Sequence, residues 1–148
     1  MTAEICVDAN LIVMLYTPEE MRNQAVLLLN ECLHNDISII APDVIWAEVD
    51  SAIRRKVYRG LLELDDGKIA ISLMSALQIN HANTLDLIFD AWRIADAYNL
   101  PTLYDAYYLA IAELRGCDFW TADERFVNSV KGLSYVRPIR DYSPGILE

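Results

Sequence analysis

Four acidic residues stand at positions where their carboxylates could act together. Asp8 and Asp123 each follow a short apolar segment typical of a buried strand, and Asp105 falls in the first turn of a predicted helix. Glu48 lies at the edge of the apolar face of another predicted helix, and its helical neighbours supply no basic partner. Four carboxylates that converge repel one another and raise their own pKa values. Mg²⁺ and Mn²⁺ prefer oxygen ligands, so such a cluster predicts a metal site suited to phosphoryl chemistry.

The elements that must position these acids alternate along the chain, which predicts an α/β fold with a small parallel sheet and helices on both sides. Strands are predicted near 4–8, 37–40, 117–121 and 133–136. Helices are predicted at 9–16, from Pro18 onward, at 43–58, 67–77, 84–99, 102–115 and 124–131, and 78–83 is a polar loop with room for a brief extended piece. Carboxyl ends of parallel strands meet at one edge of a sheet, so Asp8 and Asp123 should lie close together. Helices that start near this edge should bring Glu48 and Asp105 to the same place.

Each acid also has a purely structural interpretation, which the sequence leaves open. Asp8 and Asp123 could cap the helices that follow them, and Asp105 could complete a capping box with Thr102. The chain would then be a non-catalytic binding module. Glu48 weighs against this alternative because no cap explains it. A receiver-type phosphoacceptor domain also clusters acids around Mg²⁺, but it needs a Lys at the end of a late strand, where this chain has Thr121 and Val136-Arg-Pro.

Composition sets bounds on the class of protein. The 148 residues are 54% hydrophobic with a mean hydropathy of +0.18, which is typical of one packed globular domain. We expect this domain to span 1–137, followed by a C-terminal tail at 138–148. The net charge of −10 argues against a protein that holds nucleic acid by bulk charge. It does not exclude an enzyme whose carboxylates are neutralised locally by metal ions.

Cysteine usage and hydropathy indicate a cytoplasmic protein without a membrane partner. Cys6, Cys32 and Cys117 are odd in number and widely spaced, which favours free thiols in a reducing compartment. No apolar run approaches the roughly 20 residues of a membrane span, and the first residues lack the pattern of a signal peptide.

Two surface features could serve partners. A basic cluster at the end of the helix over 43–58 could contact phosphates through Arg54, Arg55 and Arg59, or could simply complement the helix dipole. The helix over 84–99 carries a second apolar stripe, made of Leu85, Phe89 and Trp92. An apolar stripe of this kind is either buried in the chain's own core or shared with another subunit, and we expect a dimer interface.

Taken together, the motifs resemble those of the PIN domain, and most closely the VapC-type toxin ribonucleases of prokaryotic toxin–antitoxin systems. The matching residues are Asp8-Ala-Asn10, the helical Glu48, Tyr104-Asp-Ala-Tyr-Tyr-Leu-Ala110 and Thr121-Ala-Asp-Glu-Arg-Phe126. The resemblance covers roughly residues 4–137, nearly the whole chain.

The resemblance implies a three-layer α/β/α fold and an endoribonuclease that uses Mg²⁺ or Mn²⁺ to hydrolyse RNA, leaving a 5′-phosphate and a 3′-hydroxyl. It also implies a homodimer and a small antitoxin that blocks the site. The residues it implies for the metal and catalytic site are Asp8, Glu48, Asp105 and Asp123, with Asn10 and Thr121 in support.

Overall fold

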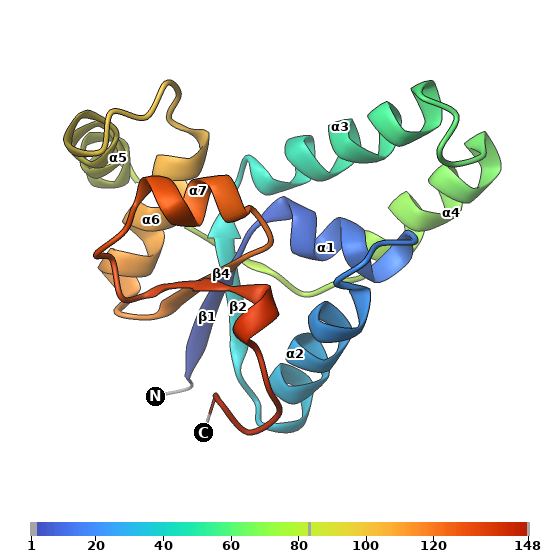
Figure 1. Ribbon diagram of the computed structural model, residues 1–148, viewed down its shortest axis with the longest axis horizontal. Coiled ribbons are helices and arrows are strands. Elements are labelled where there is room, and N and C mark those ends of the chain that lie inside the picture. The colour runs from blue at the N-terminus through green and yellow to red at the C-terminus, as the bar shows by residue number, and fades with distance from the viewer. Residues whose placement is uncertain (1–2, 83, 148) are drawn as a thin grey trace.

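The computed structural model describes residues 3–82 and 84–147, in which five strands form one parallel sheet (Figure 1). The strands are β1 (Glu4–Val7), β2 (Ser38–Pro42), β3 (Asn80–Ala82), β4 (Asp118–Thr121) and β5 (Val136–Pro138). Their order across the sheet is β3-β2-β1-β4-β5. The chain moves outward from β1 to β3 and then returns to place β4 on the other side of β1, so the order reverses between β1 and β4. Open α/β sheets bind ligands at the carboxyl ends of such a pair of strands.

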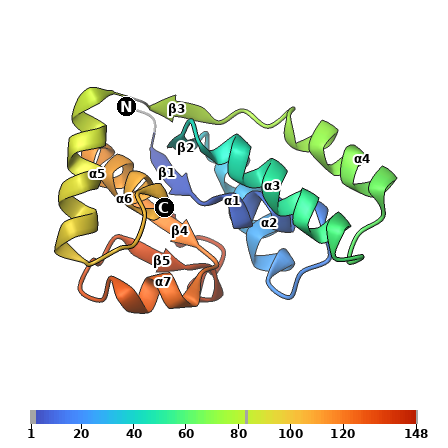
Figure 2. The same cartoon turned by 90° about the horizontal axis from the view of Figure 1, so that it is seen from above.

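Helices cover both faces of the sheet in three layers, as predicted. They are α1 (Ala9–Tyr16), α2 (Arg22–His34), α3 (Ile45–Tyr58), α4 (Leu64–Met74), α5 (Leu85–Ala97), α6 (Tyr104–Arg115), α7 (Glu124–Ser129) and the 3₁₀ turn η1 (Ile139–Asp141). Figures 1 and 2 show α1 to α4 on one side of the sheet and α5 to α7 on the other. Right-handed crossovers explain this division, because the chain crosses the sheet in opposite directions before and after β3.

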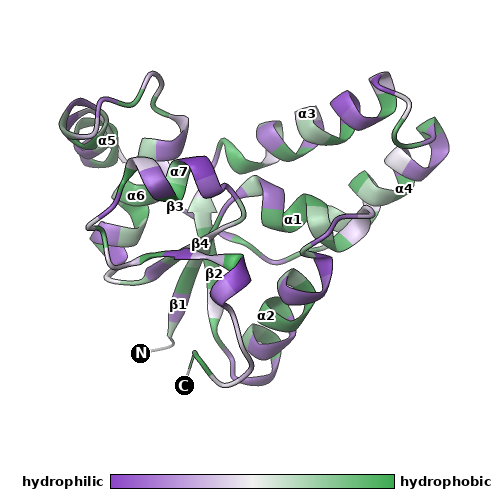
Figure 3. Ribbon diagram, in the orientation of Figure 1, coloured by the Kyte–Doolittle hydropathy of each residue, from purple (hydrophilic) through white to green (hydrophobic). Residues whose placement is uncertain are grey.

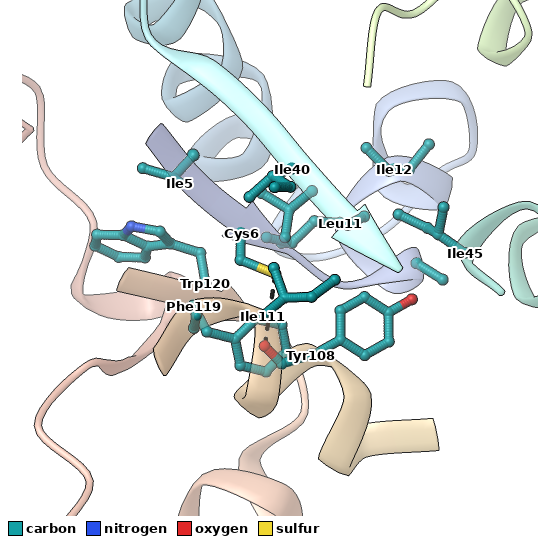
Figure 4. Close-up of a cluster of buried hydrophobic side chains, with 14 of the residues drawn as sticks. Ile5, Cys6, Leu11, Ile12, Ile40, Ile45, Tyr108, Ile111, Phe119 and Trp120 are labelled. Carbon is teal, nitrogen blue, oxygen red and sulfur yellow. Dashed lines mark hydrogen bonds between the residues drawn. The ribbon is translucent and has the colours of Figure 1, made fainter. Parts of the chain in front are cut away.

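The core forms around the two central strands, whose side chains are buried on both faces. Phe119 stacks on Tyr108 of α6 with ring centroids 5.3 Å apart, and Trp120 meets Tyr142 edge to face at 5.8 Å on the opposite face. The Cys6 thiol donates to the Tyr108 carbonyl oxygen at 3.8 Å, which ties β1 to α6 (Figure 4). Figure 3 colours each residue by hydropathy: α1 is mostly hydrophobic, whereas hydrophobic and hydrophilic residues alternate along α3. Burial on both faces fixes the ends of β1 and β4 firmly in place.

The boundaries of two helices differ from the predictions. The second helix begins at Arg22 rather than at Pro18. Thr17 closes α1 through its hydroxyl on the Val13 carbonyl, and a turn in which the Arg22 amide donates to the Glu19 carbonyl at 3.3 Å then precedes α2. The helix predicted from Gly67 starts one turn earlier, at Leu64, after an extended Glu63.

The positions of the two edge strands, β5 and β3, also depend on tertiary contacts that the sequence does not reveal. The final strand was predicted at 133–136 but spans Val136–Pro138, because Val136 pairs with Phe119 while Leu133 is held in a turn by the Val130 carbonyl. The polar loop at 78–83 contains β3, which pairs with β2; Asn83, also within that predicted loop, lies outside the described residues.

The two apolar stripes of α5 have different fates. Leu87, Ala91 and Ile94 are buried against α6 and the core. Leu85, Phe89 and Trp92 face outward, with 66%, 64% and 61% of their surface exposed. The second stripe is therefore left uncovered by the chain's own fold.

Residues beyond β5 pack on α2. Ile139 of η1 is buried, and the Tyr142 hydroxyl donates to the Glu31 carboxylate and to the Leu27 carbonyl oxygen. The Gly145 and Leu147 amides also donate to Glu31. Among the described residues, none of the helices is long and apolar enough to cross a membrane.

Candidate active site

The four acids predicted from the sequence line one open pocket of about 460 Å³ at the carboxyl edge of the sheet. Asp8 follows β1 and Asp123 follows β4, the two strands at which the sheet order reverses. The start of α3 contributes Glu48 and the start of α6 contributes Asp105. The other polar side chains on the walls are Asn10, Ser51, Arg55, Tyr104 and Tyr108. As predicted, the ends of two strands and the starts of two helices bring the four acids to one edge of the sheet.

Asp8 is the most deeply placed acid, with 9% of its surface exposed. One carboxylate oxygen accepts the Leu11 amide at 2.9 Å and so caps α1, and the other accepts the Thr121 hydroxyl. Burial raises the pKa of Asp8 to about 6, against the opposing effect of these two hydrogen bonds. The capping interpretation of Asp8 is thus correct, but it uses one oxygen and leaves the acid facing the pocket.

Thr121 connects the ends of the two central strands. Its hydroxyl donates to Asp8 and accepts the Asp123 amide at 3.0 Å, while the Asp123 carboxylate caps α7 through the Phe126 amide at 3.0 Å. The buried Thr121 therefore fixes both acids relative to each other.

Glu48 has a partner that the sequence analysis did not identify. The Tyr108 hydroxyl donates to the Glu48 carboxylate at 3.0 Å, from α6 on the far side of the pocket. The Tyr108 ring is buried in the core, and Figure 4 shows its hydroxyl pointing to the edge of the cluster on the side of Ile45. Desolvation raises the pKa of Glu48, and the hydrogen bond from Tyr108 opposes this rise.

Asp105 does not form the capping box with Thr102 that the sequence allowed as a purely structural role. Helix α6 has Leu103 at its N-cap and no side-chain cap, and Thr102 is exposed. Within the described part of the chain the Asp105 carboxylate makes no hydrogen bond, although it lines the pocket. The capping interpretation of Asp105 is therefore wrong.

The acids repel one another in a connected series. After desolvation, the charge of Asp123 raises the pKa values of Asp8 and Asp105, and the charge of Asp105 raises that of Glu48. Arg55 opposes this for Glu48 alone. The pocket consequently carries excess negative charge that a cation would relieve.

The donor set fits a hard divalent cation in chemistry, since it consists of carboxylate oxygens. In the residues that the structure describes, no three His, Cys, Asp or Glu side chains are grouped closely enough to hold one ion as they stand. Mg²⁺ is commonly held by only one or two carboxylates and keeps several water ligands, so an open arrangement of this kind suits it.

The remaining predicted residues divide between this pocket and its surroundings. Asn10 and Arg55 line the pocket. Arg59 lines a second cavity next to it, and Arg54 lies over the Tyr58 ring, 6.0 Å from its centroid. Tyr108 was missed as a site residue although it stands in the quoted Tyr-Asp-Ala-Tyr-Tyr motif. Its spacing from Asp105 was a signal, but pairing with Glu48 depends on a contact between residues 60 positions apart.

Comparisons with known proteins agree with this geometry. The model of the PIN domain matches residues 5–131. Ribonuclease VapC9 of Mycobacterium tuberculosis is 33% identical over 84 residues, which are 57% of this chain and 64% of that protein, so the match spans less than two thirds of the relative.

Two solved structures share the fold. PAE2754 from Pyrobaculum aerophilum superposes with a TM-score of 0.65 at 20% identity, over 93% of this chain and 85% of that one. A toxin–antitoxin complex from Klebsiella pneumoniae gives a TM-score of 0.58 at 21% identity, over 89% and 94% of the two chains. A family model that covers most of the chain, together with the three-layer fold and the acids at its switch point, establishes that this protein belongs to the PIN domain family.

Proposed function

We propose that this protein is a metal-dependent endoribonuclease that hydrolyses phosphodiester bonds in RNA, and that it is the toxin of a toxin–antitoxin pair. The observation that carries the proposal is the pocket in which Asp8, Glu48, Asp105 and Asp123 meet at the switch point of the sheet. The similarity to ribonuclease VapC9 supports the reaction, and the shared fold with a toxin–antitoxin complex supports the setting.

In this proposal the four acids hold Mg²⁺ or Mn²⁺. The bound ion would polarise the phosphate and lower the pKa of a water molecule. The chain's own residues set up the site: Thr121 orients Asp8 and Asp123, Tyr108 orients Glu48, and Arg55 offers a cation to a phosphate oxygen. Asn10 lines the same pocket, at the start of α1, and has a supporting role.

The partners we propose are an RNA substrate, a second copy of the chain and an antitoxin protein, all in the cytoplasm. The thiols of Cys6, Cys32 and Cys117 are free, as a reducing compartment requires. We also propose that residues 1–137 form the PIN-like domain and that 138–148 are a C-terminal tail, which begins with the last residue of β5 and packs on α2 through Ile139 and Tyr142. The alternative, a non-catalytic PIN-like module for protein or nucleic-acid binding, would keep the fold and use the acids only as caps. Asp105 and Glu48 speak against that alternative because neither is a cap.

The first prediction concerns the reaction. Asp8→Asn and Asp105→Asn should each lower Mg²⁺- or Mn²⁺-dependent cleavage of RNA by more than about 100-fold, because each removes a proposed ligand. Chelator should abolish cleavage by the wild type. Glu20→Gln, which alters an exposed acid outside the pocket, is the control. Undiminished cleavage by either Asn variant, with contaminating nuclease excluded, would remove that residue from the mechanism.

The second prediction concerns Tyr108 as a positioning residue. Tyr108→Phe keeps the buried ring but removes the hydroxyl that holds Glu48. We expect the Mn²⁺ concentration for half-maximal activity to rise by about 10-fold or more, as is typical when a partner of a metal ligand is lost. A metal titration of activity measures this, with Tyr107→Phe as the neighbouring control. An unchanged metal requirement in Tyr108→Phe would refute the role.

The third prediction concerns stability without metal. Asp105 is exposed at the mouth of the pocket, but partial desolvation and the charge of Asp123 still raise its pKa in the folded state, so the folded protein keeps this proton after the unfolded chain has lost it. Wild-type stability should therefore fall as pH rises from about 4 to 7 in chelator. Asp105→Asn removes only the share of this loss that comes from Asp105, while those of Asp8 and Glu48 remain. The variant should be roughly 0.5–1 kcal/mol more stable at pH 7, allowing for solvent screening.

Thermal melting in chelator and in Mn²⁺ tests this prediction. Asp123→Asn should behave in the same direction, because Asn caps α7 about as well as Asp. Saturating Mn²⁺ should reverse the order, since the ion stabilises the protein that binds it better. Variants no more stable than the wild type in chelator, with no Mn²⁺ shift in the wild type, would favour the capping alternative.

The fourth prediction concerns assembly. The exposed stripe of Leu85, Phe89 and Trp92 should lie in or near a homodimer interface. Light scattering should give twice the chain mass of 16.8 kDa for the wild type and the chain mass for Phe89→Asp. Leu33→Asp, which changes an even more exposed apolar residue on α2, should leave the dimer intact. A wild type that is monomeric at high micromolar concentration would end this proposal.

A further inference from the structure

A second cavity of about 310 Å³ opens beside the acidic pocket, between α1 and α3. It shares Asn10 and Arg55 with that pocket and reaches Ala122, the residue between Thr121 and Asp123. Helices α1 and α3 run side by side in both views (Figures 1 and 2). We call this cavity the α1–α3 cleft. A chain molecule bound across the four acids would therefore extend into this cleft.

The cleft and the acidic pocket have opposite charge. The pocket holds four acids and Arg55, whereas the cleft is lined by the cations Arg55, Lys56 and Arg59 and the single acid Glu19. Glu19 forms an ion pair with Lys56. Within residues 3–82 and 84–147, Arg55 and Arg59 form no ion pair, so both guanidinium groups are available to an anion. In a chain of net charge −10 this local cationic surface is an exception, and its charge suits an anionic ligand.

The helix dipole does not fully explain these cations. Positive side chains do suit the C-terminal end of α3, and Arg59 is its C-cap. That reason applies equally to Arg54, which lies over the exposed Tyr58 ring and lines neither cavity. The helix dipole therefore does not explain why two arginines that form no ion pair within the described residues, Arg55 and Arg59, lie beside the α1–α3 cleft.

The cleft also offers apolar surface of the kind that a base can cover. Val13 and Met14 of α1 and Leu61, which is 68% exposed, lie on its walls. Its volume is at the lower end of small-molecule sites, enough for about one nucleotide and too small for a duplex. Unpaired bases can leave the stack and enter such a site, whereas a paired base must first be unpaired and flipped out of the duplex.

We propose that the α1–α3 cleft binds the nucleotide next to the scissile phosphate of a single-stranded RNA. Arg55, at the boundary of the two cavities, contacts the phosphate that joins them, Arg59 contacts the next phosphate, and the apolar wall packs against the base. This inference rests on the proposed ribonuclease function, and it adds the side of the acids on which the RNA chain continues and the residues that hold it there.

Binding without cleavage gives the direct test. A fluorescein-labelled 20-nucleotide RNA of mixed sequence is titrated with Asp105→Asn protein in Mg²⁺, and the anisotropy is followed at several salt concentrations. Adding Arg59→Ala should raise Kd by about tenfold, as expected for loss of a charge-assisted hydrogen bond. It should also lower the slope of log Kd against log salt by about 0.7, the value for one phosphate of a single strand.

Three further variants separate a subsite from a general charge effect. Arg59→Lys should keep the salt slope, because the charge remains. Lys68→Ala, on the exposed face of α4 outside both cavities, should leave Kd and the slope unchanged. Arg54→Ala should cost less than Arg59→Ala. Losses equal to that of Arg59→Ala in the Lys68 and Arg54 variants would show a diffuse field and overturn the proposal, as would an Arg59→Ala protein that binds like its parent.

Kinetics separate failure of the cleft from failure of the proposed function. In the otherwise wild-type enzyme, Arg59→Ala should raise KM by about tenfold and change kcat by less than about threefold. Cleavage by the wild type with no effect of Arg59→Ala on KM or Kd would refute the cleft and leave the ribonuclease standing. Binding that depends on Arg59, in a protein that cleaves no RNA, would refute the reaction and support the cleft. A complementary duplex should bind no more weakly to Arg59→Ala than to its parent, and a loss there equal to the single-strand loss would overturn the strand preference.

Discussion

The feature on which this structure depends is a set of carboxylates held together against their mutual repulsion. Asp8 is the centre of it, nearly buried at the end of the central strand, with a pKa raised to about 6. Its backbone amide bonds the Trp120 carbonyl at 3.3 Å, so the position of the acid is fixed by the pairing of β1 with β4. Unpaired burial of a carboxylate is costly, and the Leu11 amide and Thr121 hydroxyl offset part of that cost. The fold thereby stabilises a site that its own charges oppose.

The fold resolves this conflict by attaching each acid to a rigid element. Parallel strands bring Asp8 and Asp123 to one edge, and the buried Tyr108 ring extends from the core to hold Glu48. The acids are therefore positioned both by core packing and by hydrogen bonds from side chains anchored in that core. Charged groups held in place by a rigid scaffold are the usual condition for efficient electrostatic catalysis.

Charge is also distributed along the surface in a way that suits a polyanion. The acidic pocket and the cationic cleft lie next to each other and share Arg55. This local arrangement cannot be seen in the net charge of the chain, −10, or in the summed charge of α3. Acidic and basic side chains a few residues apart in sequence face different cavities. Local charge at a groove, rather than bulk charge, decides what a protein of this composition can bind.

The sequence by itself determined the α/β class, the parallel sheet and the place of four acids at its carboxyl edge, because strand ends and helix starts are local signals. It misplaced the start of α2, which follows a turn between Glu19 and Arg22, and the position of β5, which is decided by the register of Val136 on Phe119. It also left open whether the acids were caps. Tertiary structure decided that question acid by acid, along with the Tyr108–Glu48 contact and the cleft between α1 and α3, because each depends on residues that meet only when distant segments pack together.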